Sequence, residues 1–192
     1  MSTLKVSDYK KKKSWANGME SEERWLRIHP EAEKTDYKTD RFRHVDFWHG
    51  PDQTEGVDVK GNKPPEAICL EFKNVAGEKG WMHGDAKFIA VEVLGLTGFF
   101  RFERQECLNW CKAFVSKEHV SKYSLCHHKL YTRSKWGKKD VVTSVTLHDL
   151  SDLATLTYIP WNEEDITKAG GAKTSVKYNH PITGEVMIFT VP

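Results

Sequence analysis

Two neighbouring strand-like runs near the middle of the chain constrain the fold most. Residues 86–94 (AKFIAVEVL) and 98–103 (GFFRFE) are rich in β-branched and aromatic residues, and a short glycine-containing segment separates them. This pattern predicts an antiparallel hairpin of core strands. Residues 104–118 follow directly with apolar side chains at helical spacing, which predicts an amphipathic helix.

The other predicted elements place the chain in the α+β class. Ser21 as an N-cap and Pro30 as a stop predict a short helix over residues 21–30. Further strands and a second hairpin are expected over residues 42–50, 56–61, 66–75 and 129–150. The order helix, three strands, loop, hairpin, helix, hairpin lacks the regular alternation of a doubly wound fold. We therefore expect a central mixed β-sheet flanked by helices.

Composition and element order divide the chain into three parts. Residues 1–18 are polar and lysine-rich, so we expect a flexible basic N-terminal arm. Residues 19–150 hold the predicted strands and helices and form the expected main domain. Residues 151–192 are a C-terminal extension of uncertain role, which could form two short strands around a turn at 181–184 or a loose appendage.

Composition narrows the cellular setting. The chain has 192 residues, a net charge of +2 and seven tryptophans, which fit a folded domain with a real core. No apolar run approaches the roughly 20 residues that a membrane span needs, and the polar start is unlike a signal peptide. Four cysteines without regular spacing fit a reducing compartment. We therefore expect a cytoplasmic protein, in a bacterium or a phage-infected host cell.

Two acid–lysine pairs stand on consecutive predicted strands: Asp58 with Lys60, and Glu71 with Lys73. Alternate residues of a strand share a face, so each carboxylate should emerge beside its ammonium group. Asp46 on the preceding strand adds a third carboxylate. Such carboxylates can hold Mg²⁺, and a neighbouring lysine can orient or activate water for phosphodiester hydrolysis. The pattern indicates either this chemistry or ordinary cross-strand ion pairs, each weakly stabilising.

The arrangement resembles the PD-(D/E)XK nuclease superfamily. The runs DRFRHVDFWHG, GVDVKG, ICLEFKNVAGEKGWMHGDAKFIAVEV and LYTRSKWGKKDVVTSVTLHDL look like small phage-type endonucleases of that superfamily, over residues 40–150. The resemblance implies a restriction-endonuclease-like core, built from a helix, a three-stranded meander, a helix and a strand. Valine precedes both Asp46 and Asp58, where the superfamily's name places a proline.

The resemblance implies a DNA endonuclease, whether nicking, junction-resolving or restriction-like, that uses Mg²⁺ or Mn²⁺. In the register that we favour, Asp58 is the bridging metal ligand and Lys60 positions the water. Asp46 and Glu71 then complete the metal shell. The full set of expected catalytic residues is Asp46, Asp58, Lys60, Glu71 and Lys73.

A second register remains open. There, Asp58 is the lone aspartate, and Glu71 with Lys73 is the acid–lysine pair. Glu22 or Glu23 of the predicted helix then supplies the extra ligand. Both registers keep Asp58 and Glu71 in the site.

Two basic stretches are candidate contacts with the DNA backbone. The expected residues are Lys10, Lys11, Lys12, Lys13, Arg133, Lys135, Lys138 and Lys139. Clustered lysine and arginine can neutralise phosphates, although a solvated surface has the same composition. DNA is thus the expected partner and a membrane is not. A homodimer would suit two-strand cleavage, and a single chain would suit nicking.

Two other interpretations belong to different classes. The chain could be a non-catalytic nucleic-acid-binding or inhibitor module on the same fold, acting in phage–host conflict. It could instead bind zinc through Cys107, Cys111 and residues 126–128 (CHH). Against zinc, the two helical cysteines occupy a predicted amphipathic helix, where a cysteine packs as a small hydrophobe.

Overall fold

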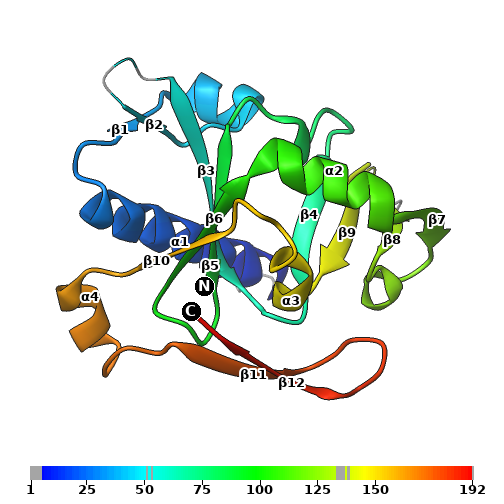
Figure 1. Cartoon of the computed structure of the whole chain (residues 1–192). Helices are drawn as coiled ribbons and strands as arrows, with labels where there is room; N and C mark the ends of the chain where they lie inside the picture. Colours follow the sequence, from blue (N-terminus) through cyan, green and yellow to red (C-terminus); the bar gives the residue numbers. More distant parts are fainter. Residues whose placement is uncertain (1–5, 51, 53, 133–136, 138, 192) are drawn as a thin grey trace, which may run out of the picture.

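The protein folds into an α+β structure with three β-sheets, as seen in a computed structural model that describes residues 6–50, 52, 54–132, 137 and 139–191, with side chains from residue 16 onward (Figure 1). The helices and helical turns are α1 (Val6–Ile28), η1 (Thr39–Arg43), η2 (Trp81–His83), α2 (Arg104–Phe114), η3 (Tyr123–Leu125), α3 (Leu147–Leu150) and α4 (Glu163–Lys168). The strands are β1 (Glu33–Lys34), β2 (Phe47–His49), β3 (Glu55–Lys63), β4 (Ile68–Lys73), β5 (Phe88–Val93), β6 (Gly98–Glu103), β7 (Ser116–Val120), β8 (Lys129–Thr132), β9 (Val141–Val145), β10 (Thr157–Pro160), β11 (Ser175–Asn179) and β12 (Val186–Thr190).

The central sheet is mixed, as expected. Its strand order is β1-β2-β3-β5-β6-β10. Strands β1, β2 and β3 form an antiparallel meander, β3 and β5 run parallel, and β5 and β6 form the predicted antiparallel hairpin. The prediction from the 86–103 pattern is therefore confirmed.

Strand β4 belongs to a second sheet, of order β4-β9-β8-β7, so the expectation that Asp46, Asp58 and Glu71 come from three adjacent strands is wrong. Ile68 and Leu70 of β4 are fully buried in the larger core, and β4 pairs antiparallel with β9. The predicted second hairpin, β8 with β9, supplies the partner strand that draws β4 away from β3.

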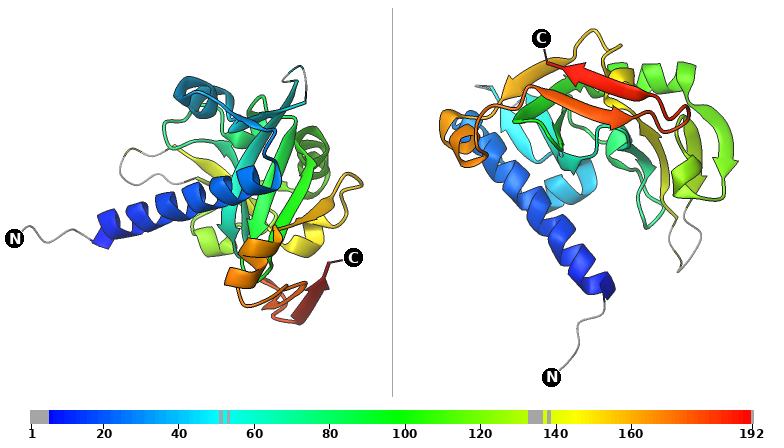
Figure 2. Two further views of the ribbon diagram at one scale, coloured as in Figure 1. Left: turned by 90° about the vertical axis from the view of Figure 1, so that its left-hand side faces the viewer. Right: turned by 90° about the horizontal axis from the view of Figure 1, so that it is seen from below.

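Helix α1 is longer than the sequence suggested. Residues 6–18, which we expected to be an arm, form its first part, and the expected N-cap at Ser21 is wrong. Lysine and glutamate are good helix formers, but the segment lacks the apolar periodicity that would have revealed the helix. The first half of α1 extends away from the body (Figure 2). Neither α1 nor any other helix of the described residues is long and apolar enough to cross a membrane.

The C-terminal residues pack on the main fold. Strand β10 pairs with β6 at the edge of the central sheet, and β11 and β12 pair with each other. Of the two alternatives for the tail, the pair of short strands is confirmed. Tyr178 and Phe189 from these two strands are buried in the larger hydrophobic core.

Two hydrophobic cores determine which way β3 points its side chains. The smaller core packs Trp25 of α1 against Val57 and Val59 of β3. The larger core lies against the other face of the central sheet and includes Trp81, Ile89 and residues of α2. Since strand residues alternate, Asp58 and Lys60 face away from the α1 core, toward the second sheet.

Gly61 allows α1 to approach β3 closely, so we expect Gly61→Ala to destabilise the fold by about 1–3 kcal/mol. A Cβ at this position would lie 2.1 Å from Oγ of Ser21 and 3.0 Å from the carbonyl oxygen of Asn17. Urea unfolding measures the effect. Gly18→Ala is the matched control on the helix itself, because nothing lies within 4 Å of its added Cβ. It should be neutral or stabilising by up to about 1 kcal/mol, and equal effects of the two changes would contradict the close approach.

Candidate active site

Acidic and basic side chains from three segments meet at a cavity of about 270 Å³. The cavity lies between α1, η1 and the end of β3. Its lining includes Glu22, Asp40, Asp46, Lys60 and Lys63. Asp58 is not among the described lining residues, but it contacts Lys60, which is.

Asp58 and Lys60 form a buried ion pair, as the strand alternation predicted. Lys60 Nζ lies 2.5 Å from Asp58 Oδ1, and Asp58 is only 1% exposed. The second carboxylate oxygen, Oδ2, is buried and finds no hydrogen-bond partner among the described residues. Burial raises the pKa of Asp58, and the neighbouring ammonium opposes that rise.

Lys60 remains charged despite its burial. Burial alone would lower its pKa, but Asp58 and Asp46 together raise the pKa above the ordinary lysine value. Its Nζ lies 5.8 Å from the ring centroid of Trp81, which forms part of its apolar surroundings. The side chain is 22% exposed and lines the cavity.

Asp46 directly precedes β2 and is held rigidly against β3. Its backbone N–H donates to Val57, and its Oδ2 accepts a 2.7 Å hydrogen bond from the backbone N–H of Val59. Burial, and then the charge of Asp58, raise the pKa of Asp46 to about 7. Two buried carboxylates, one of which raises the pKa of the other, form a ready site for a cation.

Asp40 and Glu22 join the cavity, although the favoured register named neither. Asp40 lies in η1, a π-helical turn, and burial together with Asp46 raises its pKa. Apolar periodicity does not reveal such a turn, which is frequent at functional sites. Glu22, the ligand of the alternative register, lines the cavity and binds Lys34 at 2.8 Å. Glu23, the other residue of that register, is exposed and is not among the described lining residues.

The second acid–lysine pair is not an ion pair. A β-bulge between Glu71 and Lys73 breaks the alternation that should have placed them on one face. Glu71 is half-buried, and burial raises its pKa while Lys60 and His44 lower it. Glu71 thus lies within electrostatic reach of the site but is absent from the described lining of the cavity. Lys73 is exposed at the end of β4, and no described contact brings it to the site.

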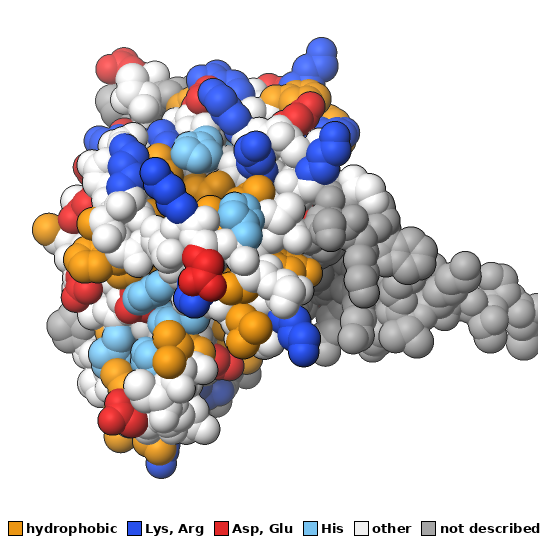
Figure 3. All heavy atoms as spheres, turned by 90° about the vertical axis from the view of Figure 1, so that its right-hand side faces the viewer, with side chains coloured by type: hydrophobic (Ala, Val, Ile, Leu, Met, Phe, Trp, Pro, Cys, Tyr) orange, Lys and Arg blue, Asp and Glu red, His pale blue; other side chains and the backbone are white. Residues whose placement is uncertain are grey.

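The predicted DNA contacts are only partly described. The backbone of residues 10–13 belongs to α1, and the side chains of Lys10, Lys11, Lys12 and Lys13 lie outside the described part. Arg133, Lys135 and Lys138 also lie outside the described residues, whereas Lys139 is exposed just before β9. Figure 3 shows lysine and arginine side chains spread over the upper part of the face that carries α2, β7 and β8.

Comparison with protein-family models, with curated proteins and with solved structures finds no match for this chain. Asp46 and Asp58 are buried carboxylates, and one oxygen of Asp58 has no described partner. A hard divalent cation with oxygen ligands, such as Mg²⁺ or Mn²⁺, fits this donor set and would satisfy that oxygen.

The raised pKa of Asp46 predicts an unusual pH dependence in the absence of divalent ions. Between its ordinary pKa of 3.8 and about 7, Asp46 keeps its proton in the folded protein and loses it in the unfolded chain. The folded state then binds more protons, so stability falls as the pH rises through this window, by up to about 4 kcal/mol.

Urea unfolding with a chelator at pH 5 and pH 8, with wild type and Asp46→Asn, measures this dependence. Asparagine keeps an oxygen that can accept from Val59 but does not titrate. We expect wild type to lose more stability than the variant on going to the higher pH. A wild type and variant that change in parallel would show that Asp46 does not titrate near neutrality.

Proposed function

We propose that the protein is a metal-dependent DNA endonuclease that hydrolyses phosphodiester bonds with Mg²⁺ or Mn²⁺. One observation carries the proposal: the buried carboxylates of Asp46 and Asp58 lie within hydrogen-bonding reach of each other, and Oδ2 of Asp58 accepts from no N–H group among the described residues. An unsatisfied buried carboxylate oxygen is costly for a fold. A bound cation would offset that cost, and Asp46 and Lys60, which lie beside Asp58, line a cavity that could hold it.

The element order supports a restriction-endonuclease-like core. Helix α1 precedes the antiparallel meander β1-β2-β3, and a later strand, β5, runs parallel to β3. The acid–lysine pair lies on β3, and the preceding aspartate lies beside β2. One departure is clear: the connection from β3 to β5 runs through β4 and η2, and α2 follows only after β6.

The chain's own residues have distinct roles in this proposal. Asp46 and Asp58 bind the cation, and Asp40 or Glu22 completes the shell from the other side of the cavity. Mg²⁺, when bound, would supply Lewis-acid activation of the phosphate and of a water molecule. Lys60 orients that water and offsets the charge that develops on the phosphate. Glu71 lies outside the described lining of the cavity and contributes its charge to the field at Lys60.

The position of α1 supports DNA as the substrate. Gly18, Met19 and Glu22 of this helix line the cavity, and residues 10–13 lie further along the same helix. A DNA backbone that reaches Asp58 from this side would pass the lysine-rich part of α1. Such contacts position the substrate without reading its sequence.

Incubation of supercoiled plasmid with wild-type protein, with Mg²⁺, Mn²⁺ or a chelator, tests the proposal. We expect open-circle or linear product with either metal and none with the chelator. The ratio of the two products distinguishes nicking from double-strand cleavage. No product from plasmid, branched and single-stranded DNA would overturn the proposal, and salt-sensitive DNA binding without cleavage would favour the non-catalytic binding module.

A further inference from the structure

Two consecutive histidines on the second sheet have an unusual arrangement. His127 and His128 lie between η3 and β8, and their rings stack with centroids 4.1 Å apart and planes 20° apart. Consecutive side chains normally diverge. Here they point the same way because His128 has a φ of +53°, a left-handed conformation that residues with side chains rarely adopt.

A carboxylate completes the group. Asp149 Oδ2 lies 3.1 Å from Nε2 of His128 and 3.8 Å from Nε2 of His127. One ligand atom from each of the three residues can be found within 4.8 Å of the other two. His127 is only 5% exposed, yet its Nδ1 is buried without a partner among the described residues, and Nε2 of His128 has no aligned hydrogen bond there.

The three side chains are held in place by the surrounding fold. The backbone N–H and hydroxyl of Thr146 donate to Asp149 at 2.6 and 2.8 Å, in the capping box of α3. On the other side, the hydroxyl of Thr143 donates to the carbonyl of Cys126, and the backbone N–H of His128 donates to Ser144. The donors are therefore ordered before any ligand arrives.

We infer that His127, His128 and Asp149 bind a borderline divalent transition metal ion of the zinc class. Two imidazole nitrogens and one carboxylate oxygen are the donors that such ions take in proteins, and they leave one tetrahedral position open. His127 also lines a cavity of about 500 Å³, together with Glu118, Lys129 and Ile182. Figure 3 shows histidine side chains gathered on the lower part of this face.

The charge states suit this role. Burial, followed by the neighbouring His128, lowers the pKa of His127 to about 4, so its ring is neutral and offers a lone pair. Burial would raise the pKa of Asp149, but contact with His128 and the hydrogen bonds from Thr146 lower it to about 2. A neutral histidine beside an ionised carboxylate is the state in which these groups bind metal.

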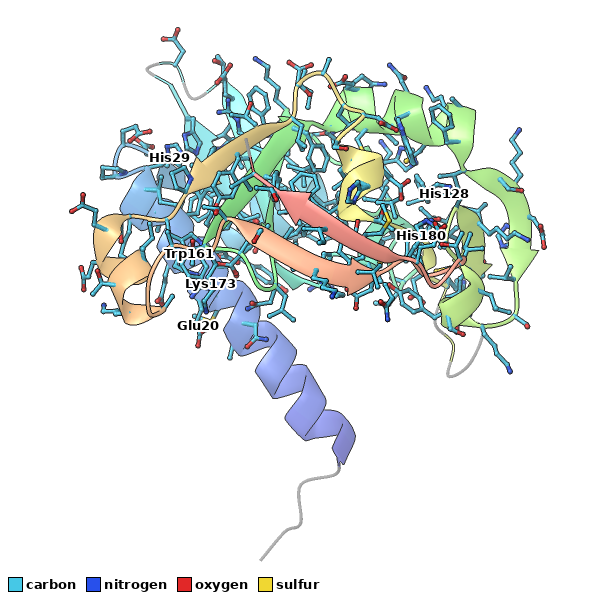
Figure 4. The ribbon with its side chains drawn as sticks, turned by 60° about the horizontal axis from the view of Figure 1, so that its bottom comes forward. Glu20, His29, His128, Trp161, Lys173 and His180 are labelled. Carbon is cyan, nitrogen blue, oxygen red and sulfur yellow. The ribbon has the colours of Figure 1, made fainter. Side chains whose placement is uncertain are left out.

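The neighbouring His180 contacts His127 and is not a ligand in this assignment. Its ring meets that of His127 edge-on, with centroids 5.3 Å apart, and His128 and His180 lie on the same side of the molecule in Figure 4. Nδ1 of His180 accepts from the backbone N–H of Thr183 at 3.2 Å. An imidazole that accepts at Nδ1 carries its proton on Nε2, which leaves no free lone pair.

A second group, His29, Glu31 and His49, offers the same donor types but the wrong tautomer. The indole N–H of Trp25 donates to Nε2 of His49 at 3.1 Å, so the neutral His49 ring carries its proton on Nδ1, the atom that faces Glu31. Figure 4 places His29 at the opposite end of the molecule from His128. This group serves as an internal control.

The thiols that the sequence offered as zinc ligands lie elsewhere. Cys107 and Cys111 are buried in the larger core on α2, and Cys126 Sγ contacts the hydroxyl of Ser144 at 3.6 Å. Of the residues that the zinc hypothesis named, only His127 and His128 belong to a group of possible metal ligands among the described residues.

Titration with Co²⁺, followed by its visible absorption and by competition with Zn²⁺, tests the inference. Wild type and Asp58→Asn are titrated in parallel, so that binding at the carboxylate cavity is subtracted. We expect one equivalent to bind in the Asp58→Asn protein. His128→Gln should weaken this binding more than about 100-fold, because even the loss of groups that only orient a ligand costs 10–100-fold. His49→Gln should leave it unchanged.

His128→Gln is the decisive variant because its side chain is 31% exposed, and the ring contacts that it loses are those with His127 and Trp110. Circular dichroism confirms that it folds, and Zn²⁺ should raise the Tm of Asp58→Asn but not of Asp58→Asn with His128→Gln. No Co²⁺ binding in the Asp58→Asn protein, binding that survives His128→Gln, or binding that disappears with His49→Gln would each overturn the inference.

Discussion

Asp58→Asn should reduce Mg²⁺-dependent DNA cleavage by at least about 10³-fold, or roughly 4 kcal/mol of transition-state stabilisation. Asparagine has nearly the same shape, and its amide oxygen can still accept from Lys60. It lacks the negative charge and replaces the unpartnered Oδ2, the atom that we assign to the cation. The initial rate of plasmid cleavage measures the loss, and Mn²⁺ titration calorimetry should show that binding at this site is lost as well.

Asp152→Asn is the matched control, because it removes the same charge from an exposed turn. Its cleavage rate should stay within about twofold of wild type, as expected for a surface change. Urea unfolding of Asp58→Asn should show a folded protein, which separates loss of chemistry from loss of structure. Cleavage by Asp58→Asn at the wild-type rate would place the active site elsewhere, or assign the activity to a contaminant.

Glu92→Gln should destabilise the fold by about 3–5 kcal/mol. Glu92 on β5 is 1% exposed and receives Nε and Nη2 of Arg24 at 2.6 and 2.9 Å, together with the hydroxyl of Ser21 at 2.5 Å. Neutralising the carboxylate leaves the guanidinium of Arg24, 15% exposed, without its main countercharge. Urea unfolding at neutral pH measures the effect.

Two further variants test whether an unpaired buried charge causes this loss of stability. Glu20→Gln removes an exposed carboxylate 3.9 Å from the same guanidinium and should cost less than about 1 kcal/mol. The double change Arg24→Met with Glu92→Leu removes both buried charges, and it should recover most of the stability lost by Glu92→Gln. A double variant that is as unstable as Glu92→Gln would mean that packing, and not an unpaired charge, carries the effect.

The part of the site that the sequence predicted depends on local geometry. Asp58 and Lys60 share a face because β3 keeps its alternation from Val57 to Lys60, where it pairs regularly with β5. The 86–103 hairpin was likewise predictable, since its two runs are adjacent along the chain and each is apolar enough to identify the core. Both results needed only neighbouring residues.

The parts of the site that the sequence did not predict depend on contacts between segments that are distant along the chain. Glu71 and Lys73 were expected on one face, but a bulge separates them, and pairing with β9 places them in another sheet. Asp40 reaches the cavity through a π-helical turn, and Glu22 reaches it because α1 packs closely on β3 at Gly61. Strand period and helix period carry no information about such contacts between distant segments.

The C-terminal hairpin, β11 with β12, has a consequence for how the protein folds during its synthesis on the ribosome. The Phe189 ring stands edge-on to Phe100 of the central sheet, 5.5 Å between centroids, and Tyr178 bonds His148 of α3 at 2.6 Å. Tyr178 and Phe189 cannot cover their part of the larger core until residues 175–190 have left the exit tunnel. Until then Phe100 lacks this ring contact, and exposed apolar surface of this kind on an incomplete chain favours aggregation.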